Sequence, residues 1–423
     1  MKKGALLVTF LFIMTTLTSS VWSLEKIGGR ELPKKKQFTL YGTLDGNNPE
    51  LEKQEIIDSY GWGAKDPDEI KDLLPEEFYE MVKHPETWGK IRVNVTPLIQ
   101  WKGKLWHRYQ ELTEKYKGTC RVSSDGELLN YIGGCPFPEP KNGIELYYNF
   151  DKRFSGDDRR MPGVMQHTDR AGFTRFNIWT NCILYYFGRL AIEPKPVYRP
   201  NPSNIDWSLA MGFTEPYTIQ GMITYFHRYL DPNKDDDMWM YFPIFRRTRR
   251  MSTKQKQDSL GAGSIVNWTN GENFYDKPTH YTWKLLGRKE MLSPRNGRLE
   301  AVWEQHKYVV GIDNYYQKIN NYVLEARSED PTHMYSKMIF YVDPYNWFVP
   351  WSLYYDRKGR PWHLEYFIWT ADANWVPEPL QTYIDLQRVY SSTAVLLRSE
   401  YNQGIVPVFY DLDSLKREFP VGR

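Results

Sequence analysis

The chain has 423 residues, of which 41% are hydrophobic and 16% aromatic, and its 55 Lys plus Arg nearly balance its 52 Asp plus Glu. A formal net charge of +3 leaves no basic surface of the kind that nucleic-acid binding requires, so we expect no nucleic-acid partner. The length suits one large or two ordinary domains, and the many Trp and Tyr favour strands and surfaces that contact apolar or sugar ligands.

The first 23 residues have the pattern of a secretory signal peptide. Lys2 and Lys3 precede an apolar run at residues 5–14, and Ser23 ends the stretch that a signal peptidase would read. The run is shorter than the ~20 residues of a bilayer-spanning helix; an uncleaved anchor or a buried helix is the alternative. We therefore expect a periplasmic protein, soluble or peripherally associated with the outer membrane, with no transmembrane segment after cleavage.

The regions that follow differ in their pattern of charged and apolar residues. Residues 24–58 are charged and lack periodic apolar positions, which predicts an extended arm. Residues 65–84 and 105–116 carry apolar side chains at helical spacing and predict two helices. We expect a single β domain over residues 59–410, followed by a C-terminal tail over residues 411–423.

Three cysteines are present. Cys120 and Cys135 lie close in sequence, and in an exported chain this predicts a disulfide worth ~3 kcal/mol in the chain-entropy model. The sequence alone leaves open whether the bond forms. Cys182 lies in an apolar run and is predicted to be a small buried side chain.

From residue 140 onward the chain alternates apolar and polar side chains with the period of strands. Such segments lie at residues 238–245, 281–285, 306–310, 335–342, 347–355 and 361–369. The last three predict an antiparallel meander, with Gly359 supplying the positive φ of its second turn. The predicted fold class is α+β, mainly antiparallel β.

The predicted strands are apolar on both faces, so each face needs a cover. We expect helices on one face and an internal cavity on the other. Each candidate cavity residue would also suit a packed core. The candidates for lining a ligand cavity are Met240, Phe242, Ile244, Trp283, Leu285, Phe340, Trp347, Trp351 and Tyr366.

No recognised catalytic or cofactor motif is present. The sequence has no nucleophile elbow, P-loop, dinucleotide fingerprint or zinc-helix motif, and its eight His are scattered singly. Residues 231–237 alternate Asp and Asn as a calcium loop does, but Asp236 replaces the required Gly and Phe242 the closing Glu. We therefore expect no enzyme, no metal and no cofactor, and a solvated acidic turn at residues 231–237.

A basic cluster follows that turn, and two interpretations of it are equally open. The cluster could contact phosphate headgroups or a protein partner, or it could be a solvated strand end. It consists of Arg246, Arg247, Arg249 and Arg250.

Five blocks resemble a known family in the same order along the chain. They lie at residues 130–138, 237–250, 281–287, 341–347 and 355–362, and include Tyr-Thr-Trp-Lys-Leu-Leu-Gly and Asn-Tyr-Ile-Gly-Gly-Cys-Pro-Phe-Pro. They are similar to the LolA/LolB-like periplasmic family of unknown function (domain of unknown function 1329), described as outer-membrane lipoprotein-sorting-like. The resemblance implies a LolA-like curved antiparallel sheet, an incomplete barrel capped by helices on its concave face. It also implies an apolar ligand between sheet and helices, and an association with RND-type exporters or outer-membrane partners.

Three functions follow, in order of preference. The first is a carrier or chaperone that shelters a lipid, a lipoprotein acyl chain or another hydrophobic molecule, because covering apolar area in water is favourable by ~25 cal/mol per Å². The second is a carbohydrate- or polymer-binding module that uses exposed aromatic side chains. The third is a hydrolase, which would need convergent carboxylates or a nucleophile with its base.

Overall fold

The computed structural model describes residues 67–89, 91–96, 98, 103–261, 263–295, 312–368, 380–396 and 399–419, and the short strands β1 (Lys26–Ile27), β2 (Arg30–Glu31) and β3 (Glu55–Asp58). The predicted signal peptide, most of the predicted arm and the predicted strand at residues 306–310 lie outside the described residues. None of the described helices is long and apolar enough to cross a membrane.

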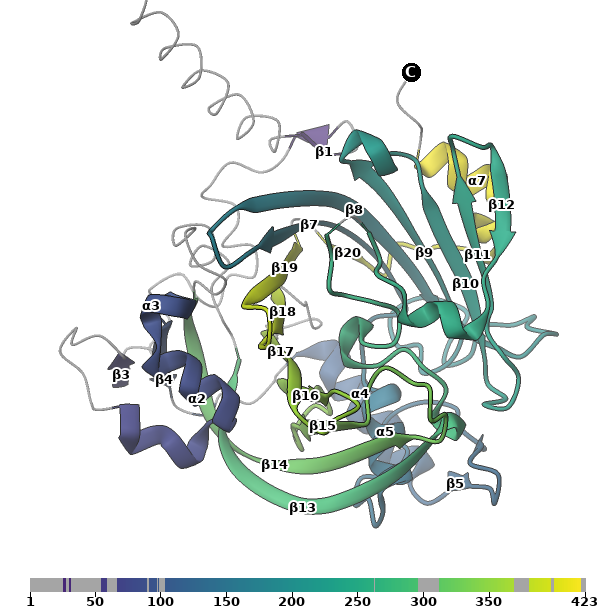
Figure 1. Ribbon diagram of the computed structural model, residues 1–423. Coiled ribbons are helices and arrows are strands. Elements are labelled where there is room, and N and C mark those ends of the chain that lie inside the picture. Colours follow the sequence, from purple (N-terminus) through teal and green to yellow (C-terminus); the bar gives the residue numbers. More distant parts are fainter. Residues whose placement is uncertain are drawn as a thin grey trace, which may run out of the picture.

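One curved sheet of sixteen strands dominates the structure (Figure 1). Its order is β12-β11-β10-β9-β8-β7-β19-β18-β17-β16-β15-β14-β4-β3, with β13 on β14 and β20 on β7. The strands are β4 (Ile91–Thr96), β7 (Asp158–Thr168), β8 (Thr174–Tyr185), β9 (Ile205–Glu215), β10 (Ile223–Tyr229), β11 (Asp237–Phe242), β12 (Arg247–Arg250), β13 (Tyr281–Pro294), β14 (Ile312–Ser328), β15 (Lys337–Val342), β16 (Trp351–Tyr355), β17 (Pro361–Ile368), β18 (Leu380–Asp385), β19 (Tyr390–Leu396) and β20 (Glu400–Tyr401). Only the β14–β4 pair within it is parallel, and β12 and β3 at the ends of the path do not close it. The predicted class, α+β with a mainly antiparallel and incomplete barrel, is confirmed. A separate two-stranded ribbon pairs β5 (Arg121–Val122) with β6 (Leu128–Leu129).

The convex face of the sheet is covered by helices. The predicted helix at 65–84 is in fact a 3-10 turn, η3 (Pro67–Leu73), followed by α2 (Glu76–Lys83), because Pro75 separates them. The short α3 (Pro85–Trp88) follows beyond the predicted end. Phe78 of α2 is fully buried, and its ring centroid lies 4.7 Å from that of Trp351. This contact joins α2 to the outer side of the β15–β18 region (Figure 1).

A second convex cover comes from the C-terminal residues. Asp411 caps α7 (Leu412–Glu418) by accepting from the backbone N–H groups of Asp413 and Ser414. A Cβ on Gly212 of β9 would meet the ring of Phe419 at 2.3 Å, so the absence of a side chain at Gly212 permits this docking. The predicted boundary at residue 410 therefore falls at the start of a helix that packs on the sheet.

Two more of the helices that the structure describes lie on the concave face. The predicted helix at 105–116 is confirmed as α4 (Lys104–Tyr116), which buries Leu105 and Tyr109. α5 (Gly143–Asp151) begins at Asn142, whose side chain accepts from the N–H of Glu145. A Cβ on Gly143 would lie 2.4 Å from the carbonyl carbon of Trp283, so α5 sits directly against the backbone of β13.

The predicted meander is confirmed, with one boundary corrected. β15, β16 and β17 pair antiparallel as expected, but the middle strand begins only at Trp351. Trp347 has φ +65° and belongs to a tight turn, because its N–H donates to the carbonyl of Asp343. The strand period therefore does not extend through residues 347–350, and Trp347 and Trp351 lie in different cores.

The predicted disulfide does not form. Cys120 and Cys135 are both free, and the Cys135 thiol donates instead to Oδ1 of Asn149, 3.3 Å away. Burial raises the pKa of the Cys135 thiol well above its usual range. Cys182 is fully buried, as predicted.

Candidate functional site

An irregular segment, residues 253–280, lies over the concave face and is called the cover segment below. It contains η5 (Thr253–Gln257), η6 (Gly271–Asn273) and η7 (Pro278–His280). Its Trp268 ring contacts Phe226 of β10 at 5.2 Å between centroids. Its Asn273 donates to Ser352 of β16 at 2.8 Å. The hollow of the sheet is therefore largely occupied by the chain itself, and the expected open cavity of lipid size is not seen in the part of the chain that the structure describes.

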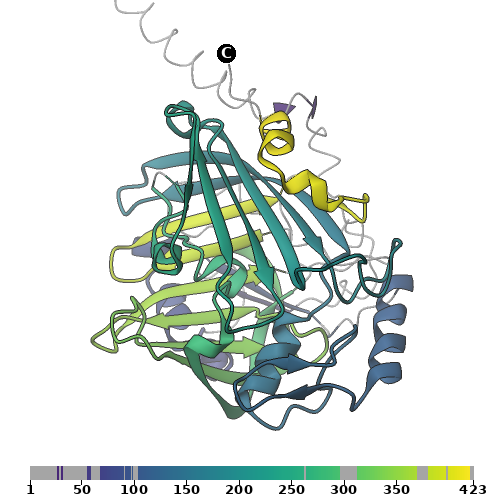
Figure 2. The same cartoon turned by 90° about the vertical axis from the view of Figure 1, so that its right-hand side faces the viewer.

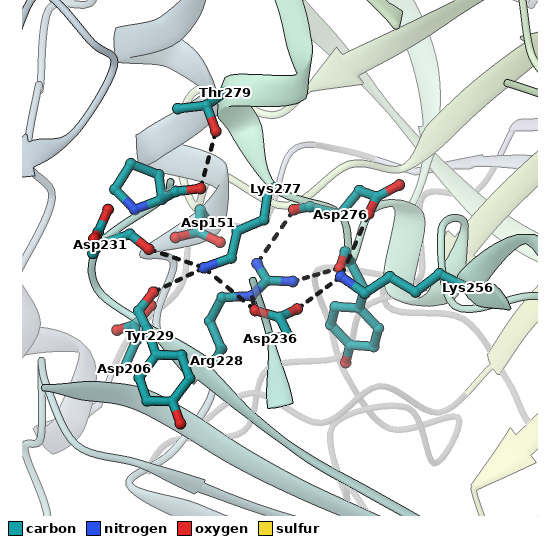
Figure 3. Close-up of polar contacts among 12 residues, drawn as sticks. Asp151, Asp206, Arg228, Tyr229, Asp231, Asp236, Lys256, Asp276, Lys277 and Thr279 are labelled. Atoms are coloured by element: carbon teal, nitrogen blue, oxygen red, sulfur yellow. Dashed lines mark hydrogen bonds and ion pairs between the residues drawn. The ribbon is translucent and has the colours of Figure 1, made fainter. Parts of the chain in front are cut away.

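Both stems of the cover segment meet at one buried carboxylate (Figure 3). Asp236, just before β11, accepts from Nε of Arg228 at 2.8 Å and from Nζ of Lys256 at 2.7 Å. Nζ of Lys277 lies 3.3 Å from it. Lys256 also reaches Asp276, 3.4 Å away. We call these five residues the ion cluster, and it ties the beginning and end of the cover segment to β10 and β11.

The electrostatics of the ion cluster follow from its burial. Burial raises the pKa of Asp236, but the positive charges of Arg228, Lys256 and Lys277 lower it by a larger amount. The net pKa lies well below the usual range of a carboxyl group, so Asp236 is ionised. Burial, together with the nearby Arg228, lowers the pKa of Lys277 to about 8. Lys277 is held by the carbonyls of Tyr229 and Asp231, each 3.1 Å away. Each charged group of the ion cluster is therefore stabilised by its charged and polar neighbours in the protein, because burial has removed the water that would otherwise solvate it.

The tip of the cover segment, residues 263–266, is held by hydrogen bonds and by two buried side chains, those of Ile265 and Val266. The backbone N–H of Ile265 donates to Oγ of Ser392 at 3.2 Å, and that hydroxyl lies 2.8 Å from Nδ1 of His167. Tyr390 donates to the carbonyl of Gly263. Burial, and secondarily Arg175, lowers the pKa of His167 to about 4, so the imidazole is neutral near pH 7.

Between the cover segment and strands β7–β9, β18 and β19 lies a partly open cavity of about 40 Å³, which we call the methionine groove. At ~10–15 Å³ per water this is room for about three waters. Methionine side chains adapt to irregular shapes better than branched ones. The groove is lined by Met161, Met165, Trp179, Asn181, Met211, Leu260, Val266, Trp268, Gly271, Glu272, Tyr275, Gln381, Tyr383 and Leu396.

Two polar atoms of residues that line the groove lack a partner. Nε1 of Trp179 and Oδ1 of Asn181 are buried and make no hydrogen bond with the residues that the structure describes. Trp179 is 6% exposed and is positioned by Gly163, where a Cβ would lie 2.8 Å from the indole ring. The methionine groove therefore offers one donor and one acceptor among apolar walls.

One wall of the groove is ionic. Glu272 accepts from Arg159, with oxygens 2.6 and 2.7 Å away, and from Arg153 at 3.2 Å. Burial raises the pKa of Glu272, but Arg159 and then Arg153 lower it below its usual range. This carboxylate is fully engaged, so it is not free to act as a general acid or base.

The structure does not bring the nine residues predicted to line a cavity into one site, and none of them lines the methionine groove. Phe340 and Trp347 are buried in the concave core, where Trp283 and Leu285 pack at its margin. The others divide among three environments: Trp351 and Tyr366 in the convex core, Met240 and Phe242 half-buried on β11, and Ile244 exposed in the turn after β11, because that strand ends at Phe242 and not at residue 245 as predicted. The four arginines of the basic cluster are all exposed.

Sequence reasoning missed the groove, although part of its signal is readable. Met161, Gly163 and Met165 alternate along β7, with a glycine between two methionines where the Trp179 ring packs. A period-two pattern of this kind marks one face of a strand. The cover segment has no such period, and its position depends on the ion cluster, whose members are distant in sequence.

Together these features define a class: an α+β protein with a strongly curved, open antiparallel sheet whose concave face is closed by helices and an irregular segment. Within that class, the chain belongs to the family "Protein of unknown function (DUF1329)", whose model matches residues 63–407. The family membership predicted from the sequence is confirmed.

Other proteins are similar to this chain. "Uncharacterized protein PA3922" of Pseudomonas aeruginosa is 26% identical over 316 residues, 71% of this chain and 67% of that protein. A putative outer membrane lipoprotein-sorting protein domain from Vibrio parahaemolyticus has a TM-score of 0.48 at 16% identity, covering 65% of this chain and 98% of that one. A DUF1329 family protein from Desulfovibrio piger has a TM-score of 0.47 at 17% identity, covering 64% and 96%. LolA superfamily protein NE2245 from Nitrosomonas europaea has a TM-score of 0.40 at 14% identity, covering 62% and 94%.

Proposed function

We propose that this protein is a non-catalytic carrier of a hydrophobic molecule, which it binds in the methionine groove after the cover segment moves outward. The observation that carries the proposal is the groove itself. Three methionines and Trp179 of the lining meet beneath a segment that is anchored at its stems by buried charges and held at its tip by hydrogen bonds and the side chains of Ile265 and Val266. Adaptable apolar walls under a displaceable cover suit a guest that must be shielded from water.

The size of the groove determines how a guest enters. A cavity of about 40 Å³ is too small for an acyl chain, so binding requires that the tip of the cover segment leave the strands. Its side-chain and backbone contacts with Ser392 and Tyr390 are hydrogen bonds, worth ~0.5–1.5 kcal/mol each. The guest's own burial, at ~25 cal/mol per Å² of apolar area, offsets the loss of these hydrogen bonds after less than ~200 Å². The guest must also cover the side chains of Ile265 and Val266, which are buried when the tip is closed.

The first experiment is mass spectrometry of the organic extract of natively purified protein, combined with titration by the neutral fluorescent probe N-phenyl-1-naphthylamine. We expect an apolar compound to co-purify with the protein. After that compound is extracted, the protein should bind the probe more strongly than before extraction. Lipid-free preparations that also bind no probe would refute the carrier function.

A reversible crosslink tests the route of entry. Oγ of Ser264 lies 3.4 Å from Sδ of Met165, so Ser264→Cys with Met165→Cys, in a Cys120→Ser background, should join the tip to β7 when oxidised. We expect the oxidised protein to bind probe at least tenfold more weakly than the same protein reduced. Met165→Cys alone carries the same change in the groove and should bind equally in both conditions. Equal binding by the oxidised and reduced double variant would place the guest elsewhere.

The alternative functions have less support. A sugar-binding platform needs a row of exposed aromatic rings. None of the tryptophans that the structure describes is exposed, and the exposed rings of Phe173, Tyr217 and Phe245 stand at separate turns. A hydrolase needs free acid–base groups, whereas the Glu272 carboxylate in the groove wall is held by two arginines. A glycan array is the direct check on the first alternative.

The location and partners of the carrier are part of the proposal. The N-terminal sequence supports export to the periplasm, where a carrier would meet a membrane exporter of the RND type or an outer-membrane protein. Fractionation of cells that express the full chain tests the location. A pull-down from solubilised membranes tests the partner.

A further inference from the structure

Three hairpin turns of the sheet lie at the same end of adjacent strands. The register pairs Ile178 of β8 with Glu215 of β9, and Ile223 of β10 with Tyr241 of β11. The turns after β7, β9 and β11 therefore follow one another along this end, two strands or ~10 Å apart across the sheet. The β7–β8 turn projects farther than the other two, because residues 174–177 of β8 extend beyond the end of β9. We call the segments 169–176, 215–222 and 242–250 the turn rim. In Figure 2 the blue-green β7–β8 turn lies on the left, on the same side as the yellow turn that joins β18 to β19.

The turn rim exposes large apolar side chains. Tyr217 is 86% exposed, Ile244 79%, Phe245 65% and Phe173 63%. Single exposed apolar residues are ordinary, but these four stand at three consecutive turns. Ile244 and Phe245 are adjacent at the tip of one turn. None of them contributes to the cores of the protein.

The same turns carry an excess of positive charge. Residues 169–176, 215–222 and 242–250 contain six arginines and two carboxylates, a net charge of 6 − 2 = +4, in a chain whose total is only +3. Arg246, Arg247 and Arg249 are exposed and form no ion pair with any residue that the structure describes. Arg250 alone in this hairpin is paired, with Asp237.

Apolar side chains at turn tips, flanked by arginines, match the interface of an anionic bilayer. Rings and aliphatic groups insert at the headgroup boundary, while guanidinium groups remain at the level of the phosphates and pair with them. A protein partner would favour a continuous apolar patch with a polar rim, whereas these tips are separated by arginines and strand ends.

We propose that the turn rim is a membrane-docking surface, which inserts Ile244 and Phe245 into a bilayer leaflet containing anionic lipids. The tip of the cover segment lies at this same end, because Gly261 approaches Phe213 of β9 and Gly263 approaches Arg175 of the rim. The proposal does not depend on the carrier function, since a bilayer can be bound whether or not the methionine groove holds a guest.

The test is co-sedimentation of the protein, expressed as the full chain and purified, with two kinds of vesicles. One kind is phosphatidylcholine alone, and the other contains phosphatidylcholine and phosphatidylglycerol in equal parts. We expect binding to the anionic vesicles that weakens at high salt. Arg247→Gln with Arg249→Gln should bind about 25-fold more weakly, at ~5-fold per arginine. Ile244→Ser with Phe245→Ser should lose at least tenfold.

Matched control variants distinguish docking through the turn rim from non-specific binding to vesicles. Val406→Ser with Val408→Ser removes two exposed valines near η8 (Pro407–Tyr410), away from the turn rim. Lys115→Gln with Lys117→Gln removes two charges at the end of α4. Both should bind as the unaltered protein does. The proposal is overturned if the unaltered protein ignores anionic vesicles, which would leave a protein partner for the rim, or if the control variants lose as much as the rim variants.

Discussion

Neutralising Asp236 should release the cover segment. The carboxylate accepts from Arg228 and Lys256 and faces Lys277 within 3.3 Å. Asp236→Asn therefore removes the one carboxylate that these three buried cations share, and leaves Asp276 beside Lys256 and Asp151 near Arg228. Removing one partner of a buried ion pair costs ~3–5 kcal/mol, and we expect a loss of that size in the free energy of unfolding. Urea titration followed by Trp fluorescence measures it.

The release should also be local. Because both stems of the cover segment meet at the ion cluster, amide hydrogen exchange in residues 258–275 should accelerate more in Asp236→Asn than exchange in β15 or β16. Adding Lys256→Met removes one of the three buried cations and should restore part of the lost stability, as a double-mutant cycle will show.

The neighbouring residue supplies the control. Asp235 is exposed and forms no ion pair within the described chain, so Asp235→Asn removes the same charge at a solvated position and should cost under ~0.5 kcal/mol. If Asp236→Asn is no more destabilising than Asp235→Asn, the ion cluster does not hold the cover segment, and the reasoning from buried charge is refuted.

Three further predictions concern single residues. The pKa of His167 is about 4, against 6.5 for a free imidazole, so the unfolded chain binds more protons than the folded chain between these pH values. The free energy of unfolding should therefore fall by ~3 kcal/mol as the pH drops from 6.5 to 4. In denaturant titrations, His167→Gln should make the free energy of unfolding depend less on pH over this range. The unaltered protein, with Cys120 and Cys135 free, should unfold at the same urea concentration with and without reductant, as Cys120→Ser does; a reductant-dependent midpoint in the unaltered protein alone would instead restore the disulfide. Gly143→Ala should cost at least ~1–3 kcal/mol, because its Cβ would lie 2.4 Å from the Trp283 carbonyl carbon; Gly261→Ala, whose Cβ would meet only side-chain atoms at 3.3 Å or more, is the control, and equal losses would contradict the close contact of α5 with β13.

The strands were predictable because their pattern is local. Residues 335–342 and 361–369 alternate over long enough stretches to indicate β15 and β17, and Gly359 marks the turn between β16 and β17. The prediction that Trp347 shares a strand face with Trp351 was wrong, because side chains alternate with a period of two only in extended backbone. Residues 343–347 form a tight turn instead, in which the N–H of Trp347 donates to the carbonyl of Asp343.

The site was less predictable, because its parts are assembled over long range. Arg228 and Lys277 are nearly fifty residues apart in sequence, and nothing in either neighbourhood indicates that Asp236 will join them. The sequence pattern at residues 231–237 was interpreted as a solvated acidic turn. The exposed Asp231, Asn233 and Asp235 fit that interpretation, but Asp236 points inward and is 8% exposed.

The ion cluster also explains how a covered concave face is compatible with carrying a guest. An apolar cover would be most stable when closed, and each opening would expose its buried surface to water at ~25 cal/mol per Å². Here the stems are fixed by paired buried charges. The tip is held by polar contacts of Ser264 and Ile265 that water can replace, and by the buried side chains of Ile265 and Val266, which a bound guest would cover again. With its stems fixed and its tip able to leave the strands, the cover segment can open while the ion cluster remains folded. The end of the sheet toward which it would open carries the arginines and exposed aromatic rings of the turn rim.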